Sequence, residues 1–398
     1  MLAAGLAGCA STHSGPARPA TPAAAATVSR APGPLGEARG GPLIPAGTDW
    51  TTLLRGPSHY GTAAGVGPQS ADLRWQRNLG SAIVAGPVTR GDAAYVASDG
   101  GVLHAIDIST GRDLWTFDGG GPLGLEDLST APTVLADGLI LWPGPHGRVY
   151  ALSPAGKLRW TVSSSGEPLT PAVDERARLL VIAGANGVVS GYRLMAGDAA
   201  PARVWSRRLA HPSYGNPAIG ADGTTYVTAG DSLYALAPSG QLRWQVRTPQ
   251  PVEVSAAVAQ DGTVVFGSDD KIEYGVNPDG GIRWRHAIGN FTYSSPVGVP
   301  GNLVVYGNHS GVVSVLDAAD GRLLRSVRGT GQIWTSAAVD SRGDLYFATQ
   351  AGGIYGFGPS GSKLFAIQAG GNFDSYPAIA ADGTLLVGGS DGVLRAIR

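Results

Sequence analysis

Short apolar segments follow one another along residues 71–398, and clusters of Gly, Asp, Pro or Ser separate them. One copy of the pattern has such segments at residues 216–219, 225–228, 233–236 and 242–246. Runs of four or five residues rich in β-branched and aromatic side chains predict strands, and the separating residues predict tight turns. We therefore expect each copy to form four short antiparallel strands.

The four-segment unit repeats eight times, and its fourth segment carries a large apolar residue, usually tryptophan. Neighbouring markers lie 39 to 45 residues apart, a period typical of repeat folds. Four strands of about five residues with short turns account for this length. The markers are Trp75, Trp115, Trp160, Trp205, Trp244, Trp284, Leu324 and Phe365.

The series of fourth segments begins before the first set of inner segments, so the last set of inner segments has no fourth segment after it. The first of them, at residues 71–79, precedes the first inner strand, and the chain stops at Arg398 without a last one. A closed ring would pair these ends and leave no interior strand edge unpaired. We therefore expect an all-β, eight-bladed β-propeller of four-stranded antiparallel blades, in which residues 71–79 complete the last blade.

The tryptophans are interpreted as packing residues between blades. Recurrent small residues, Ala105, Ala151 and Ala235 among them, are expected in the neighbouring blade, where they leave room for a large ring. A ligand site would not need six equivalent copies of one side chain. A structural role is therefore assigned to Trp75, Trp115, Trp160, Trp205, Trp244 and Trp284.

The run Ser98-Asp-Gly-Gly-Val-Leu-His-Ala-Ile-Asp107, followed by Ser109-Thr-Gly-Arg-Asp-Leu-Trp115, resembles the PQQ-like (quinoprotein-type) propeller repeat. In that repeat a strand ends in Asp, a Thr-Gly turn follows, and Trp lies on the next strand. Residues 390–397 repeat the first half of this motif. The resemblance covers about residues 71–398, and residues 50–61 resemble the Trp and Arg-Gly segment that often precedes such propellers.

The resemblance implies one of two functions. One branch of the family contains dehydrogenases that hold pyrroloquinoline quinone and calcium above the channel; many carry adjacent cysteines, whereas this chain has one Cys and no long insertions. The other contains BamB-type lipoproteins of outer-membrane protein assembly, which are similar to this chain in length and layout. The resemblance therefore implies a non-catalytic envelope scaffold without a cofactor. The alternatives are a reduced quinone- and calcium-dependent dehydrogenase, or a glycan- or peptide-binding propeller.

The first 49 residues differ in composition from the repeats. Leu6-Ala-Gly-Cys9 resembles the lipobox of bacterial lipoproteins, which makes residues 1–9 the remnant of a lipoprotein signal and Cys9 the lipidation site. The alternative is an unpaired Cys in a tail, since the positive charge typical of an export signal is absent. Residues 10–49 are rich in Ala and Pro, which predicts a disordered tether. Residues 50–70 are expected to lead into the propeller.

Charge and hydropathy limit the partners. The formal net charge is −1 and basic residues are scattered, which argues against nucleic acid. No apolar run after residue 10 approaches the roughly 18 residues that cross a bilayer. We therefore expect an exported protein of the bacterial cell envelope that contacts envelope proteins. Its lipid would be the only membrane contact, on the periplasmic face of the outer membrane where the host has one.

The loops from each fourth strand to the next inner strand are expected to meet around one mouth of the channel. The residue three positions before each inner strand is aromatic or acidic in five consecutive blades, which suggests a surface for a peptide, a glycan or a flat cofactor. These candidate rim residues are Tyr214, Glu253, Tyr293, Trp334 and Asp374, with Phe291, Phe373 and Tyr376 beside them.

The candidate rim allows two further interpretations. In the dehydrogenase alternative, Glu253 and Asp374 would supply oxygen ligands to calcium, and Trp334 would form a stacking floor for the quinone. Alternatively, the aromatic loops only close the mouth of the channel. The seven histidines show no zinc-ligand spacing.

Overall fold

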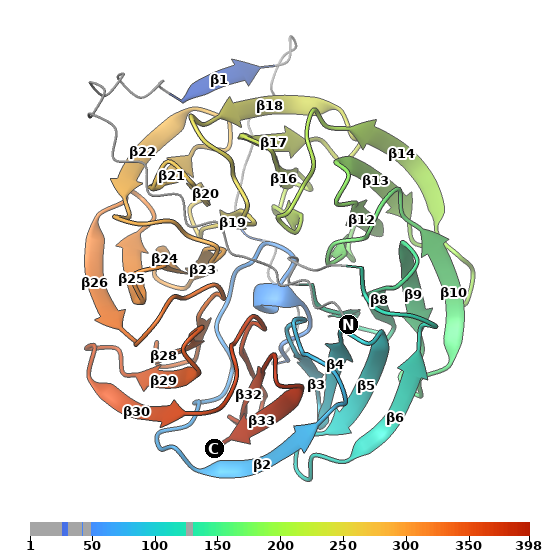
Figure 1. Cartoon of the computed structure of the whole chain (residues 1–398). Coiled ribbons are helices and arrows are strands. Elements are labelled where there is room, and N and C mark those ends of the chain that lie inside the picture. Colours follow the sequence, from blue (N-terminus) through green and yellow to red (C-terminus); the bar gives the residue numbers. More distant parts are fainter. Residues whose placement is uncertain (1–25, 31–41, 43–48, 125–129) are drawn as a thin grey trace, which may run out of the picture.

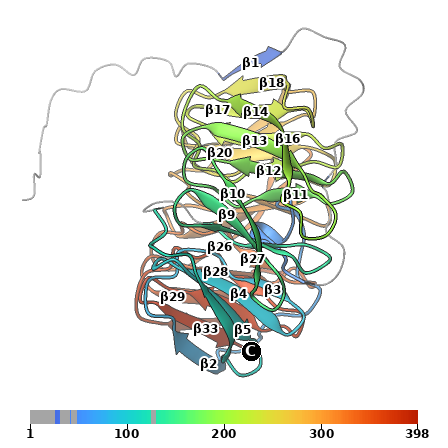
Figure 2. The ribbon, with the colours of Figure 1, turned by 90° about the vertical axis from the view of Figure 1, so that its right-hand side faces the viewer.

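The computed structural model describes residues 26–30, 42, 49–124 and 130–398. Eight sheets stand around a central axis, and each is built on four antiparallel strands, which follow chain order from the channel outwards in all blades but the last (Figure 1). This arrangement confirms the predicted eight-bladed β-propeller. Figure 2 shows the ring from its side.

The strands of the first four blades agree with the four-segment pattern. Blade 1 contains β3 (Val88–Arg90), β4 (Ala93–Ser98), β5 (Val102–Asp107) and β6 (Asp113–Asp118). Blade 2 contains β7 (Thr133–Val134), β8 (Ile140–Gly144), β9 (Arg148–Leu152) and β10 (Leu158–Ser163). Blade 3 contains β11 (Ala172–Asp174), β12 (Leu179–Ala183), β13 (Val188–Arg193) and β14 (Ala202–Arg208). Blade 4 contains β15 (Ala218–Ile219), β16 (Thr225–Ala229), β17 (Ser232–Leu236) and β18 (Leu242–Arg247).

The last four blades follow the same order. Blade 5 contains β19 (Ala257–Val258), β20 (Val264–Ser268), β21 (Ile272–Val276) and β22 (Ile282–Ala287). Blade 6 contains β23 (Val297–Val299), β24 (Leu303–Gly307), β25 (Val312–Asp317) and β26 (Leu323–Arg328). Blade 7 contains β27 (Ala338–Val339), β28 (Leu345–Ala348), β29 (Gly353–Phe357) and β30 (Lys363–Gln368). Blade 8 contains β31 (Ala378–Ile379), β32 (Leu385–Gly388), β33 (Val393–Ile397) and β2 (Leu73–Asn78).

The ring closes as the sequence predicts. Strand β2 pairs antiparallel with β33, with Trp75 opposite Ala396. A backbone hydrogen bond of 2.9 Å from the Arg398 N–H to the Asp72 carbonyl extends the pairing at one end. The outer strand of the last blade therefore comes from the start of the propeller.

Five of the six tryptophans pack against the next blade in the same way, and we call this contact a dock. Each indole N–H donates to a backbone carbonyl in that blade's turn between the third and fourth strands, over 2.7 to 2.9 Å. A glycine of positive φ in the same turn lies so close that a Cβ atom there would come within 2.5 to 2.7 Å of the ring. The pairs are Trp75–Gly111, Trp115–Gly156, Trp205–Gly240, Trp244–Gly280 and Trp284–Gly321. These contacts support the packing role proposed for the rings.

The small residues expected in the neighbouring blade lie in the same blade as the ring. Ala105 pairs across the sheet with Trp115, and Ala151 pairs with Trp160. Ala235 pairs with Trp244 in the same way. That part of the expectation is wrong because the third strand runs directly beneath the ring, whereas the next blade reaches it through a turn glycine.

The lead-in segment fills part of the central channel, where Figure 1 shows it inside the ring. It contains the short 3-10 helix η1 (Leu53–Arg55), whose side chains are buried. Its backbone bonds to the innermost strands of six blades over 2.7 to 3.0 Å. The pairs are Trp50–Thr89, Thr51–Val134, Pro57–Ile219, Ser58–Val258, His59–Gly298 and Ala63–Val339. The segment therefore contributes to the core.

Strand β1 (Thr27–Arg30) pairs antiparallel with β18 and adds a fifth strand to blade 4 (Figures 1 and 2). At these four residues the expectation of a disordered tether is wrong, because the free outer edge of β18 offers unpaired backbone groups that a passing segment can satisfy. Cys9 and the remaining tether residues other than 26, 42 and 49 lie outside the described residues. No helix within the described ranges has the length and apolar content needed to cross a bilayer.

Candidate functional site

The connections of the blades fall on two faces of the ring. Because neighbouring strands are antiparallel, the loops between blades and the turns between second and third strands lie on one face. We call this the rim face, and the face that carries the other turns the opposite face. All five predicted rim residues lie in loops between blades, at 209–217, 248–256, 288–296, 329–337 and 369–377.

Four aromatic rings meet on the rim face over blades 5 to 7, and we call them the aromatic patch: Phe291, Tyr293, His309 and Trp334. The ring centroids of Tyr293 and Trp334 are 5.6 Å apart at an interplanar angle of 78°. His309 lies 4.7 Å from Tyr293 and stacks on Trp334 at 5.9 Å. Phe291, Tyr293 and Trp334 remain 41%, 37% and 38% exposed. The patch is thus both packed and accessible.

Hydrogen bonds fix the loops that carry the patch. The His309 backbone N–H donates to the Phe291 carbonyl over 3.0 Å. The buried Thr292 hydroxyl, between Phe291 and Tyr293, donates to the Gly307 carbonyl over 2.8 Å. The Trp334 indole N–H donates to the Gln332 side chain over 2.9 Å. A surface held in this way loses little conformational freedom on binding.

Charged groups border the aromatic patch on the side of Phe291. The Lys271 ammonium lies 4.9 Å from the centre of the Phe291 ring, a cation–π contact. Beyond it, burial and the charges of Glu253 and Asp270 raise the pKa of Asp269 to about 6. Burial lowers the pKa of His309, so its imidazole is neutral at pH 7. The patch therefore presents uncharged rings next to an acidic edge.

The structure brings together only Tyr293 and Trp334 of the five predicted rim residues as ring neighbours. Tyr214 is 44% exposed on the same face, outside the aromatic patch. Asp374 accepts a hydrogen bond from the Gln350 amide over 2.5 Å. Phe373 and Tyr376 are buried and do not contribute to the surface.

Sequence reasoning missed His309, which completes the patch. His309 lies in the turn between β24 and β25, whereas only loops between blades were considered as sources of rim residues. The strand order alone could have identified His309 as a candidate, because in an antiparallel blade the turns between second and third strands lie on the same face as the loops between blades.

The residues considered for calcium and quinone do not fit those groups. Within the described ranges, no three His, Cys, Asp or Glu side chains are grouped so that they could hold a metal ion. Glu253 lies in the loop between blades 4 and 5, whereas Asp374 lies in the loop between blades 7 and 8 and accepts the Gln350 amide. Trp334 has one side stacked on His309. The donor set and the stacking floor of the dehydrogenase alternative are therefore not assembled.

Comparison with known proteins relates the chain to one family. A family model described as outer membrane protein assembly factor BamB matches residues 21–207 and 193–397. BamB of Burkholderia pseudomallei is 29% identical over 333 residues, which cover 69% of this chain and 84% of that protein. BamB of Yersinia pestis is 26% identical over 304 residues, which cover 70% and 72%.

Solved structures show the same fold. The crystal structure of BamB from Moraxella catarrhalis has a TM-score of 0.64 at 13% identity, covering 82% of this chain and 99% of that one. The quinohemoprotein alcohol dehydrogenase from Comamonas testosteroni has a TM-score of 0.66 at 14% identity, covering 85% and 76%. At these identities the likeness shows the shared propeller alone.

Proposed function

Because the chain belongs to the family of the outer membrane protein assembly factor BamB, we propose that it is a scaffold of the bacterial cell envelope that takes part in outer-membrane protein assembly. The aromatic patch on the rim face is the observation that carries this proposal. Its rings come from the loops on both sides of blade 6 and from a turn within that blade. A partner protein would bind there.

The chemistry of the patch suits a protein partner. Exposed, rigid Trp and Tyr side chains are typical of the residues that dominate protein–protein binding energy. Lys271 and the acidic edge would supply the polar surroundings that such interfaces have. We propose that the protein is not an enzyme and uses neither quinone nor calcium. Glu253 and Asp374 lie in loops that are three blades apart, and Asp374 accepts the Gln350 amide, which supports this.

Loss of the two central rings should strongly weaken partner binding without unfolding the protein. In the double variant Tyr293→Ala/Trp334→Ala we expect affinity to fall at least about 30-fold, since one such hot-spot side chain contributes about 2 kcal/mol or more. The melting temperature should change little because both rings are more than a third exposed. Affinity capture from the native envelope, quantified by mass spectrometry, measures the loss.

Tyr214→Ala is the matched control, because Tyr214 is an exposed aromatic residue of the same face outside the patch. It should retain the partner. Equal capture by the double variant and the native protein would refute the role of the patch.

We also propose that Cys9 carries lipid and anchors the protein at the membrane. The lipobox-like Leu6-Ala-Gly-Cys9 supports this proposal. Cells grown with labelled palmitate should label the native protein and leave Cys9→Ser unlabelled, and the variant should move from the membrane to the soluble fraction. A label that persists in Cys9→Ser would rule out this anchor.

A further inference from the structure

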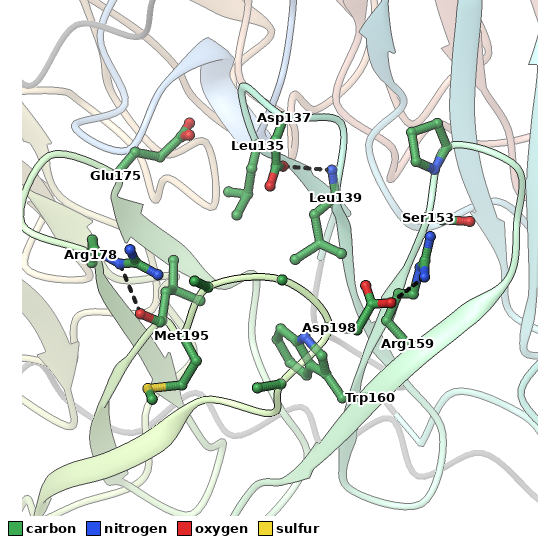
Figure 3. A pocket seen from close by; sticks show the side chains of 15 residues that line it. Leu135, Asp137, Leu139, Ser153, Arg159, Trp160, Glu175, Arg178, Met195 and Asp198 are labelled. Carbon is green, nitrogen blue, oxygen red and sulfur yellow. Dashed lines mark hydrogen bonds and ion pairs between the residues drawn. The ribbon is translucent and has the colours of Figure 1, made fainter.

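A cavity of about 510 Å³ opens between blades 2 and 3 (Figure 3). Its walls are the turns between first and second strands and between third and fourth strands of both blades, together with Arg159 and Trp160 of β10. These turns belong to the opposite face, so the cavity and the aromatic patch face away from each other. Its volume lies within the range of about 300 to 1,000 Å³ common for ligand pockets.

The cavity lies where the sixth tryptophan lacks its dock. Trp160 is only 8% exposed and lines the cavity. The other five indole N–H groups each bond to a carbonyl of the next blade, but no such acceptor serves Trp160 within the described part of the chain. The turn glycine of blade 3, Gly197, also lies away from the ring, because a Cβ atom there would meet nothing within 4 Å.

A longer turn explains the missing dock. Residues 194–201 connect β13 to β14, which makes this turn eight residues long, whereas the corresponding turn has five residues in the other blades that contain one. Two hydrogen bonds, one between backbone groups and one from a side chain, hold its start against the first turn of its own blade. The Leu194 N–H donates to the Arg178 carbonyl, and the Arg178 Nε–H donates to the Leu194 carbonyl, each over 2.9 Å.

Arg159, the residue before Trp160, also has a different partner from the equivalent arginines of other blades. In blades 4, 5 and 8 the equivalent arginine forms an ion pair with an Asp in the first turn of its own blade: Arg243–Asp222, Arg283–Asp261 and Arg74–Asp382. In blade 2, Arg159 pairs instead with Asp198 of the long turn. Asp137, which occupies the usual partner's place, accepts the Leu139 N–H over 2.9 Å and lines the cavity (Figure 3). The ring and the arginine have thus both lost their usual partners, and the cavity occupies that space.

The five occupied docks show what this ring would recognise. The carbonyl that binds each indole lies two or three residues before the glycine under the ring. In three docks it belongs to proline, in the sequences Pro154-Ala-Gly, Pro238-Ser-Gly and Pro278-Asp-Gly. The preferred partner is therefore a Pro-Xaa-Gly turn, whose glycine allows the backbone to approach the ring.

We propose that the cavity at Trp160 binds a Pro-Xaa-Gly turn of a partner protein, which replaces the missing internal dock. The turn's carbonyl accepts the Trp160 indole N–H, and its glycine lies on the ring. Glu175 and Arg178 line the far wall with both signs of charge, where the Glu175 carboxylate accepts the Ala136 N–H and the Arg178 Nε–H donates to the Leu194 carbonyl (Figure 3). The opposite face thus carries a second protein-binding site, independent of the aromatic patch.

A peptide copied from an occupied dock tests the proposal. The probe is Leu-Ala-Pro-Ser-Gly-Gln-Leu, which is residues 236–242 of this chain and contains the turn that receives Trp205. The nine indole N–H resonances of the full chain, labelled with ¹⁵N-tryptophan, are followed by NMR during titration. The Trp160 resonance, assigned with Trp160→Phe, should shift downfield and saturate at millimolar peptide. The Trp205 resonance should not move, because its acceptor is already in place.

Two controls separate recognition from non-specific contact. A peptide with valine in place of the glycine should not shift the Trp160 resonance. Trp160→Phe keeps a ring but removes the N–H, and it should weaken peptide binding at least tenfold in fluorescence polarisation, whereas Trp205→Phe should not. An unmoved Trp160 resonance, or equal shifts with both peptides, would overturn the proposal. So would a Trp160 resonance that changes when residues 1–25 are deleted, because the occupant would then be the protein's own amino terminus.

Discussion

Replacing Trp244 by alanine is expected to lower the free energy of unfolding by roughly 3 to 5 kcal/mol, the usual cost of removing a large aromatic side chain from a core. Trp244 is 1% exposed, and its ring covers Gly280 of the next blade. Its indole N–H donates to the Pro278 carbonyl over 2.8 Å. The substitution would open a cavity between blades 4 and 5 and remove the donor from that carbonyl. Urea unfolding followed by circular dichroism measures the change.

Two variants show which part of the dock contributes the stability. Trp244→Phe keeps most of the buried ring and loses the hydrogen bond, so it should retain more than half of the stability that Trp244→Ala removes. Trp115→Ala removes a partly exposed ring that makes the same kind of dock, and its effect should be smaller. A loss below about 1 kcal/mol for Trp244→Ala would contradict the burial of this ring.

Glu273→Gln is expected to stabilise the protein at neutral pH. Glu273 is 0% exposed, and neither carboxyl oxygen has a hydrogen-bond partner among the described residues. The corresponding position of the third strand is apolar in the other seven blades: Leu103, Val149, Val189, Leu233, Val313, Ile354 and Leu394. Burial raises the pKa of Glu273 to about 8. The folded protein therefore holds this carboxyl protonated at pH 7.

The increase in stability caused by Glu273→Gln should depend on pH. The ordinary pKa of a glutamate is 4.5, so between pH 4.5 and about 8 the unfolded chain ionises Glu273 while the folded protein keeps the proton. The contribution of Glu273 to the free energy of unfolding is therefore at its maximum below pH 4.5 and decreases as pH rises towards 8. Glutamine has no proton to lose, so Glu273→Gln should raise the free energy of unfolding by about 3 kcal/mol at pH 7 and hardly at all at pH 4.5.

Comparison of the native protein with Glu273→Gln isolates this group from other titrations. Burial lowers the pKa of His59 to about 4, so its contribution changes in the opposite direction, increasing as pH rises from about 4 to 6.5. His59 is present in both proteins, and its effect cancels in the difference. Urea unfolding at pH 4.5, 6, 7 and 8 gives that difference. A value that stays constant across this range would show that Glu273 does not titrate as described.

The fold was predictable because its information is local and repeated. Each blade is specified by apolar runs and turn residues within about 40 positions. The strands assigned in one repeat can therefore be checked against the same pattern in the next repeat. The lead-in and β1 have no such repetition. Residues 50–67 are ordered by the channel that the completed ring provides, and Thr27–Arg30 by the free edge of β18. Neither environment is encoded near those residues.

The candidate site was predictable in part. Neighbouring blades place equivalent loop positions side by side, which brought Tyr293 and Trp334 together. Side-chain direction alternates along these loops, so Phe373 and Ser375 are buried on either side of the partly exposed Asp374. A place beside the rim in sequence therefore does not imply a place on its surface. The cavity at Trp160 was not predicted, although the sequence contains its cause, the eight-residue turn at 194–201.

We propose that the rim face, through its aromatic patch, binds a protein of the outer-membrane assembly machinery. Site-specific photo-crosslinking in the native host tests it most directly, with the crosslinking residue at position 334 or, on the opposite face, at Ser360 in the exposed turn of blade 7. We predict one defined envelope protein crosslinked from position 334 and none from position 360, because blade 7 lies across the ring from the cavity between blades 2 and 3. A product from position 360 with none from position 334 would contradict the account.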